Sequence, residues 1–175
     1  MAEPVTQRPV DPGALDRWRR RMAQAGQAPW LHGEVARRMA ERLPIVRQRP
    51  QCVVDWWAAS SGSGDVLSTA YPQARIQAVR VPGAAVAAPT PAAPWWSARR
   101  WRGAGEAQAP LDAQALPAGA AQLLWANMTL HAVADPAAEM TAWRRALAVD
   151  GFLMFSTLGP DTLKSLRALY AEAGW

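Results

Sequence analysis

Polar residues follow the apolar runs of this sequence, at the points where strands would end. Asp55 comes directly after the run 52–54, and a turn of small residues leads from it to Gly62 and Gly64. Asn127 follows a second apolar run, 122–126. Because ligands of parallel sheets bind beyond the carboxyl ends of the strands, these residues predict a binding site for a small molecule.

A second group of polar residues, Thr157, Gly159 and Asp161, follows the apolar run 152–155. These residues could contact a ligand, and they could also begin the next helix. His131 follows Asn127 and could act as a base, but a lone histidine after a strand is more often a structural hydrogen-bonding residue. We therefore assign no catalytic residue from the sequence.

The hydrophobic pattern predicts the elements that position these residues. Apolar runs predict four strands, at 52–55, 76–81, 122–126 and 152–156. Helical periodicity and capping residues predict helices at 14–21, 31–43, 65–70, 136–147 and from about 160 onward. We expect the last helix to pack through Leu163, Leu166 and Tyr170. Strands that alternate with helices predict an α/β fold with a mostly parallel sheet, and the run 152–156 is typical of its centre.

Length and composition restrict the class of protein. The chain has 175 residues, of which 50% are hydrophobic and 19% charged, so it can bury a core and is not disordered throughout. We expect a basic, partly helical or flexible arm at 1–28 and one domain at 29–175. A single cysteine excludes internal disulfides and a cysteine-rich zinc site, and we expect no metal. Without a signal peptide or an apolar run of about 18 residues, we expect a soluble cytoplasmic protein with no membrane contact.

Three segments together resemble a known family. They are the run Phe155 to Lys164, the run Trp125 to His131, and the helical sequence Trp143-Arg144-Arg145. They resemble the malonyl-acyl-carrier-protein O-methyltransferases of biotin synthesis, which are class I S-adenosylmethionine-dependent methyltransferases. The resemblance implies a Rossmann-like sheet and transfer of a methyl group to the free carboxylate of a malonyl thioester. It also implies an acidic acyl carrier protein as partner.

The resemblance further implies which residues bind the cofactor. Asp55 matches the acidic start of the family's glycine-rich turn, but the three glycine positions fall on Trp57, Ala59 and Ser61. A lengthened turn could bring Gly62 and Gly64 to the ligand instead.

Two further positions follow from the same resemblance. The acidic residue that binds the ribose falls on Arg80, whose guanidinium has no acceptor. Asp112 matches the residue that receives the adenine amino group, and Asn127 is placed to touch cofactor or substrate. His131, Thr157, Gly159 and Asp161 are candidates on the substrate side.

Several alternatives remain open at this stage. The altered turn also fits a catalytically inactive relative that acts as a binding protein. The arginines Arg17, Arg19 to Arg21, Arg37, Arg38 and Arg42 could steer an acidic carrier protein, or they could simply be solvated helix faces. Trp95, Trp96 and Trp101 among arginines could stack on nucleic acid, although covering the sheet is the better explanation. The family's last two strands have no counterpart up to Trp175, so we expect an open sheet edge that favours homo-oligomers.

Overall fold

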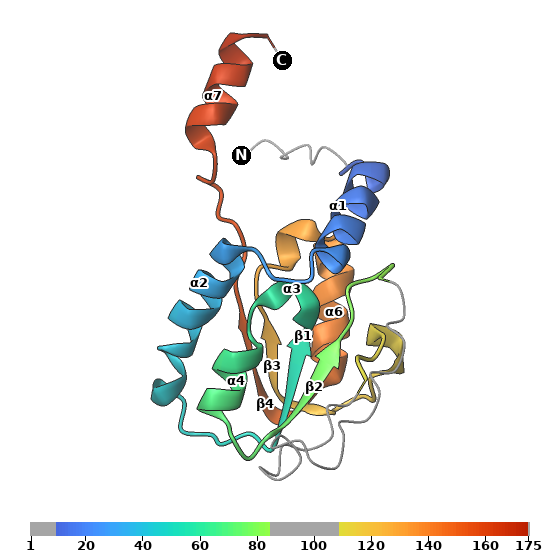
Figure 1. Ribbon diagram of the computed structural model, residues 1–175, viewed down its shortest axis with the longest axis vertical. Helices are drawn as coiled ribbons and strands as arrows, with labels where there is room; N and C mark the ends of the chain where they lie inside the picture. Colours follow the sequence, from blue (N-terminus) through green and yellow to red (C-terminus); the bar gives the residue numbers. More distant parts are fainter. Residues whose placement is uncertain (1–9, 85–108, 175) are drawn as a thin grey trace, which may run out of the picture.

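The computed structural model describes residues 10–84 and 109–174, and its centre is a four-stranded parallel sheet flanked by helices (Figure 1). The strand order is β2-β1-β3-β4. The strands are β1 (Cys52–Trp56), β2 (Arg75–Val79), β3 (Ala121–Ala126) and β4 (Leu147–Phe155). Every neighbouring pair is parallel, which confirms the predicted α/β class. Trp95, Trp96 and Trp101 lie outside the described residues.

Helices connect and cover the strands. They are α1 (Pro12–Gln24), α2 (Trp30–Ala40), α3 (Ala58–Ser61), α4 (Gly64–Ala70), α6 (Pro136–Ala146) and α7 (Lys164–Glu172). Single 3-10 turns occur at η1 (Leu43–Ile45), η2 (Ala113–Ala115) and η3 (Leu130–Ala132). As predicted, the Asp135 carboxylate caps α6 by accepting from the backbone N–H groups of Ala137 and Ala138. Within 10–84 and 109–174, no helix is long and apolar enough to cross a membrane.

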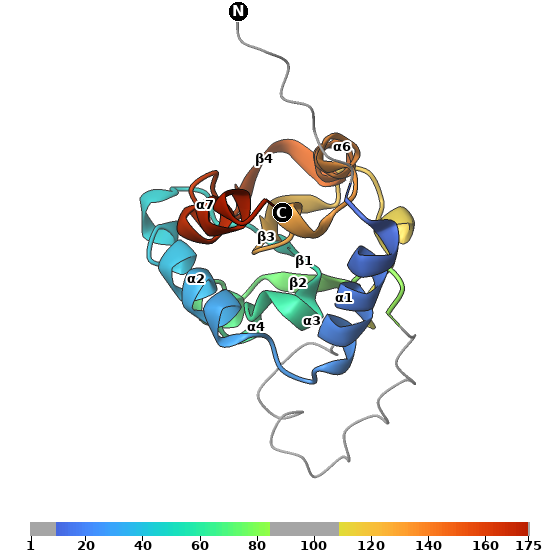
Figure 2. The same cartoon turned by 90° about the horizontal axis from the view of Figure 1, so that it is seen from above.

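The two faces of the sheet build two apolar clusters. Side chains alternate along a strand, so Val53 and Leu123 point to one face while Val54 and Leu124 point to the other. The first face packs against α2 and α4, and the second against α1 and α6 (Figure 2). The predicted helix at 31–43 is confirmed, but its buried face is formed by His32, Ala36 and Met39, and Leu31 is 40% exposed.

The carboxyl-terminal elements differ from the prediction. β4 lies at an edge of the described sheet rather than at its centre, and its side chains are half-buried or exposed. Leu163 has a left-handed backbone with φ 57°, so α7 begins only at Lys164 and projects away from the sheet (Figure 1). The predicted packing of Leu163, Leu166 and Tyr170 is wrong, because these side chains are 65%, 44% and 45% exposed.

The start of β4 is also irregular. The predicted strand begins at 152, but Asp150 and Gly151 already lie within β4, and Asp150 has φ 61°. The register shifts between Ala121 and Leu123 of β3, which indicates a bulge in the pairing. A Cβ atom at Gly151 would lie 2.7 Å from the Ala121 carbonyl oxygen, so only glycine fits this bulge.

Candidate functional site

The turn after β1 is longer than a simple glycine-rich turn. Trp57 follows the strand with φ 58° and ψ 46°, and its carbonyl oxygen accepts from the backbone N–H groups of Ser60 and Ser61. This single helical turn is α3, and it ends at Gly62, which also has a positive φ of 66°. Four residues, 58–61, therefore separate the two left-handed positions, 57 and 62, and α4 begins at Gly64.

The two glycines predicted to approach a ligand have different surroundings. A Cβ atom on Gly62 would lie 3.0 Å from the backbone N and Cα of Gly33 in α2, so close packing against α2 requires glycine there. Gly64 is exposed at the first position of α4, and a Cβ there would meet open space. Packing accounts for Gly62, and its contact with a cofactor stays a prediction, as does that of Gly64.

Asp55 is buried at the carboxyl end of β1, with 2% of the residue exposed. Its Oδ2 accepts a hydrogen bond of 3.2 Å from the Ser61 hydroxyl, whereas its Oδ1 has no partner among the described residues. Burial is the main cause that raises the pKa of Asp55 to about 7, and the Ser61 hydrogen bond opposes it. A cationic or hydrogen-bonding ligand would satisfy Oδ1 and favour the ionised carboxylate.

Asn127 is fully buried and joins four parts of the fold. Its Nδ2 donates to the carbonyl oxygens of His32 at 2.7 Å and Ser61 at 2.6 Å. Its Oδ1 accepts from the Ser156 hydroxyl at 2.7 Å. Asn127 thus ties α2, the turn after β1 and the end of β4 to β3. The sequence indicated Asn127 as a ligand-contacting residue, but it gave no signal for its partners.

Helix α1 lies at the edge of the sheet to which the strands point (Figure 1). Its Leu15 is buried in the same cluster as Trp57, and Trp57 itself is 1% exposed. The Arg19 guanidinium lies over the Trp57 indole, 5.6 Å from the ring centroid. The sequence predicted a basic, partly helical or flexible arm at 1–28 and gave no signal that Arg19 lies at the site.

Arg80 and Asp112 contact each other. Arg80 Nε donates to Asp112 Oδ1 at 3.1 Å, and Nη2 donates to Oδ2 at 2.6 Å. Backbone hydrogen bonds between Arg80 and Leu111 and between Leu111 and Ala78 bring the two side chains together. The positions that the resemblance relates to ribose and adenine binding are therefore adjacent, and they carry opposite charges.

The residues predicted on the substrate side lie in η3 and in the segment between β4 and α7. His131 belongs to η3, and its ring meets Trp18 of α1 edge-on at 6.4 Å between centroids. Thr157, Gly159 and Asp161 are exposed in the segment between β4 and α7, and Asp161 lies 3.6 Å from Lys164. Ser156, which precedes them, is bound to Asn127, so this segment starts at the site.

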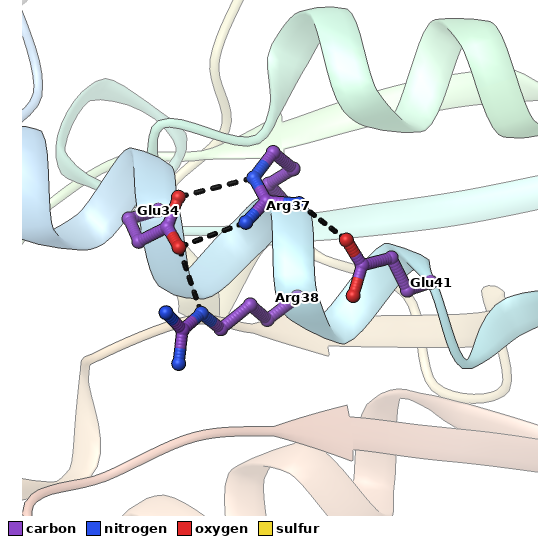
Figure 3. A network of polar contacts seen from close by, with 4 residues as sticks. All are labelled: Glu34, Arg37, Arg38 and Glu41. Atoms are coloured by element: carbon purple, nitrogen blue, oxygen red, sulfur yellow. Dashed lines mark hydrogen bonds and ion pairs between the residues drawn. The ribbon is translucent and has the colours of Figure 1, made fainter.

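The arginines of α2 are largely paired with acids. Glu34 accepts from both Arg37 and Arg38, and Arg37 also donates to Glu41 (Figure 3). The hydrogen bonds from Arg37 and Arg38 lower the pKa of Glu34 to about 2. These contacts neutralise two of the cations that were predicted to attract an acidic partner.

The residues at the end of β1 fit the charged end of S-adenosylmethionine. Asp55 offers a buried, unpartnered carboxylate oxygen, and the Thr129 hydroxyl beyond β3 is likewise buried without a partner among the described residues. Arg80 does not fit the ribose, since it cannot accept from hydroxyl groups. The described residues contain no group of three or more His, Cys, Asp or Glu side chains that could hold a metal ion.

Comparison with known proteins finds relatives of one kind. No protein-family model matches the chain. It is 34% identical over 155 residues to a malonyl-(acyl-carrier protein) O-methyltransferase from Laribacter hongkongensis, covering 87% of this chain and 52% of the relative. A protein of the same name from Methylovorus is 35% identical over 143 residues, covering 81% of this chain and 48% of the relative.

A third relative of that name, from Halorhodospira halophila, is 33% identical over 144 residues, covering 82% of this chain and 47% of the relative. The chain thus spans about half the length of the curated relatives it matches. These similarities confirm that the chain resembles the malonyl-acyl-carrier-protein O-methyltransferases, and its parallel four-stranded sheet is consistent with a Rossmann-like methyltransferase fold.

Proposed function

We propose that this protein is an S-adenosylmethionine-dependent O-methyltransferase that methylates the free carboxylate of a malonyl group carried by an acyl carrier protein in the cytoplasm. The observation that carries this proposal is the similarity to proteins of that name over most of the chain. The polar groups at the carboxyl edge of β1 and β3 support it, because this is where a parallel sheet binds its ligand.

Asp55 and Thr129 are the residues that would hold the cofactor, together with Asp112, which keeps 60% of its side chain exposed. When bound, S-adenosylmethionine supplies an electrophilic methyl group on a sulfonium cation. A positive charge beside Asp55 lowers its pKa from about 7, so the carboxylate is ionised in the complex at neutral pH. The site around Asp55 is thereby matched to a cationic ligand.

The proposed reaction needs no proton transfer from the protein. The acceptor is a carboxylate, which is already ionised near neutral pH. The chain's residues therefore have to align two reactants and keep water from them, which is where most of the rate gain would arise. This agrees with a site whose buried polar side chains Asp55 and Asn127 carry out no acid–base step.

Helix α1 has to shift for this binding mode. Trp57 is covered by Arg19 and lies in one apolar cluster with Leu15, so a ligand at the turn must displace part of α1. α1 would then close over the bound ligand and exclude water, which gives the helix a role in the reaction rather than only in stability.

The proposed carrier-protein partner is acidic, and three exposed arginines remain to attract it. Arg20, Arg21 and Arg42 make no ion pair with any described residue. Long-range attraction between opposite charges raises the rate of association. Arg37 and Arg38, which are held by Glu34, are expected to contribute less.

Methyl transfer to malonyl-acyl carrier protein tests the proposal. The full chain is incubated with S-adenosylmethionine and the malonyl carrier, and intact mass spectrometry measures the addition of one methyl group. Acetyl-acyl carrier protein, which lacks the free carboxylate, is the acceptor control and should stay unmodified. Asp55→Asn should lower the rate at least tenfold, whereas the exposed Asp150→Asn should not.

The absence of product at any protein concentration would contradict the proposal. Carrier-protein binding without methyl transfer would instead support the alternative, a catalytically inactive relative that acts as a binding protein. Surface plasmon resonance with the immobilised carrier separates these two outcomes, since it measures association independently of transfer.

A further inference from the structure

Trp57 combines a bulky side chain with a left-handed backbone. Its φ of 58° and ψ of 46° are sterically unfavourable for residues other than glycine, and strain of this kind persists only where the surroundings hold it. By the family resemblance, Trp57 also falls on the first glycine position of the glycine-rich turn. The strained backbone fixes a large aromatic face at the place that the turn offers to a ligand.

The face of this indole already holds a cation. The Arg19 guanidinium carbon lies 5.6 Å from the ring centroid, within the range of a cation–π interaction. Trp57 is 1% exposed, and removal of water from the ring strengthens such contacts. The ring is therefore an effective site for a positive charge.

Polar contacts hold Arg19 only weakly in this position. Its Nη2 donates to the Ala132 carbonyl oxygen at 3.3 Å, and its Nη1 lies 3.6 Å from Asp16. Its Nε is buried and has no partner among the described residues. Another cation that binds the Trp57 face would not have to break a strong hydrogen-bond network.

We propose that the Trp57 indole is a specificity-determining site for positively charged ligands. It selects the sulfonium of S-adenosylmethionine over the neutral thioether that is left after methyl transfer. Arg19 occupies this face of the ring until the ligand displaces it. The inference rests on the proposed function. When S-adenosylmethionine displaces Arg19, its sulfonium makes a similar cation–π contact with the Trp57 ring. The neutral thioether of the product displaces Arg19 but makes no such contact. The site would thus release the product more readily than the substrate.

Other nearby groups could also favour a cation. Asp55 ends β1, and Glu139 accepts from the Trp56 indole N–H at 2.6 Å and interacts electrostatically with Arg19. Replacing Trp57 leaves both acids in place. A preference that is lost with the ring therefore belongs to the ring and not to the acids.

Isothermal titration calorimetry of the full chain at pH 8 tests the inference with three ligands. S-adenosylmethionine and sinefungin, which has an amine in place of the sulfonium, are positively charged, and S-adenosylhomocysteine is neutral at this position. We expect the native chain to bind the two cations on the order of tenfold more tightly than the neutral ligand. Trp57→Phe should keep most of this preference, and Trp57→Leu should reduce it to about threefold or less.

Arg19 is tested with a matched pair of variants. Arg19→Gln should strengthen binding of all three ligands several-fold, because none has to displace the guanidinium, while Arg20→Gln on the exposed face of α1 should change little. Arg19→Gln and Arg20→Gln test whether the ligand has to displace Arg19 from the Trp57 ring. They do so even if thermal unfolding shows that Trp57→Leu does not fold.

Results of two kinds would overturn the inference. Equal affinity for charged and neutral ligands, a preference that survives Trp57→Leu, or no gain from Arg19→Gln would overturn the role of Trp57 and leave the proposed function standing. No binding of any ligand to the native chain and to Arg19→Gln would overturn both.

Discussion

Arg80 and Asp112 form a two-point ion pair, in which Nε lies 3.1 Å from Oδ1 and Nη2 lies 2.6 Å from Oδ2. By the family resemblance, Asp112 is the candidate for adenine recognition, and Arg80 falls on the position expected to hold the acid that binds the ribose. The pair engages both carboxylate oxygens of Asp112 with an arginine that cannot accept a hydrogen bond. Ligand binding at Asp112 therefore competes with Arg80.

We expect Arg80→Gln to tighten the binding of S-adenosylhomocysteine about tenfold, because it releases Asp112 as an acceptor and one hydrogen bond to a charged group contributes about 1.5 kcal/mol net. Calorimetry measures the change. Arg144→Gln, which removes one exposed positive charge from α6, is the matched control and should have no effect. Weaker binding by Arg80→Gln would mean that the guanidinium itself contacts the nucleoside.

Asn127 is expected to stabilise the fold strongly. Asn127→Ala leaves the His32 and Ser61 carbonyl oxygens without their donor, which should lower the free energy of unfolding by roughly 3 kcal/mol. Ser156→Ala removes one of the Asn127 contacts and should cost about 1 kcal/mol. Urea denaturation gives both values. The exposed Gln73→Ala should change stability by under about 0.5 kcal/mol, and a similar small change for Asn127→Ala would contradict the network.

Asp55 should make stability depend on pH. Its pKa is about 7 in the folded chain and near 3.8 when unfolded, so between these values the folded state binds the extra proton. The contribution of Asp55 to the free energy of unfolding should therefore be highest below about pH 4. It should fall as the pH rises towards 7, by up to about 1.4 kcal/mol per pH unit, with no further loss above pH 7.

Urea denaturation of Asp55→Asn between pH 4 and 8 checks this dependence. The variant cannot ionise at this position, so the fall in stability between pH 4 and 7 should be shallower than in the native chain. Asp150→Asn changes an exposed carboxyl and should keep the native slope. The same slope in Asp55→Asn and in the native chain would show that another group is responsible.

The exposed edge at β4 leads to a prediction about association. Val149 is 92% exposed on this strand, and an uncovered strand edge with apolar side chains favours pairing with another chain. We expect self-association in light scattering that weakens in Val149→Lys. Met140→Lys, on the exposed side of α6, should not weaken it. A native chain that is monomeric across the concentration range would contradict the prediction.

The sequence predicted the fold well where local signals agreed. The four strands are rich in apolar residues, and the Asp135 cap with Pro136 marked the start of α6. The prediction was wrong at α7, because an amphipathic pattern shows that a helix can form but not that a surface exists for it to pack on. It also missed the edge position of β4, since an apolar run does not define which neighbours a strand has.

The candidate site could be predicted only in part. The positions of Asp55 and Asn127 followed from where strands end, and the structure places both at the carboxyl edge of the sheet. The contact between Arg19 and Trp57 joins residues far apart in the chain, and no local pattern indicates it. The ion pair between Arg80 and Asp112 was not predicted either, because the resemblance assigned a role to each residue on its own.

Calorimetric titration of the native chain with S-adenosylhomocysteine at pH 8, alongside Asp55→Asn and Asp150→Asn, tests the central claim most directly. The account predicts saturable binding at one site per chain, at least tenfold weaker in Asp55→Asn and unchanged in Asp150→Asn. The absence of binding heat at high protein concentration, or equal binding by Asp55→Asn, would contradict it.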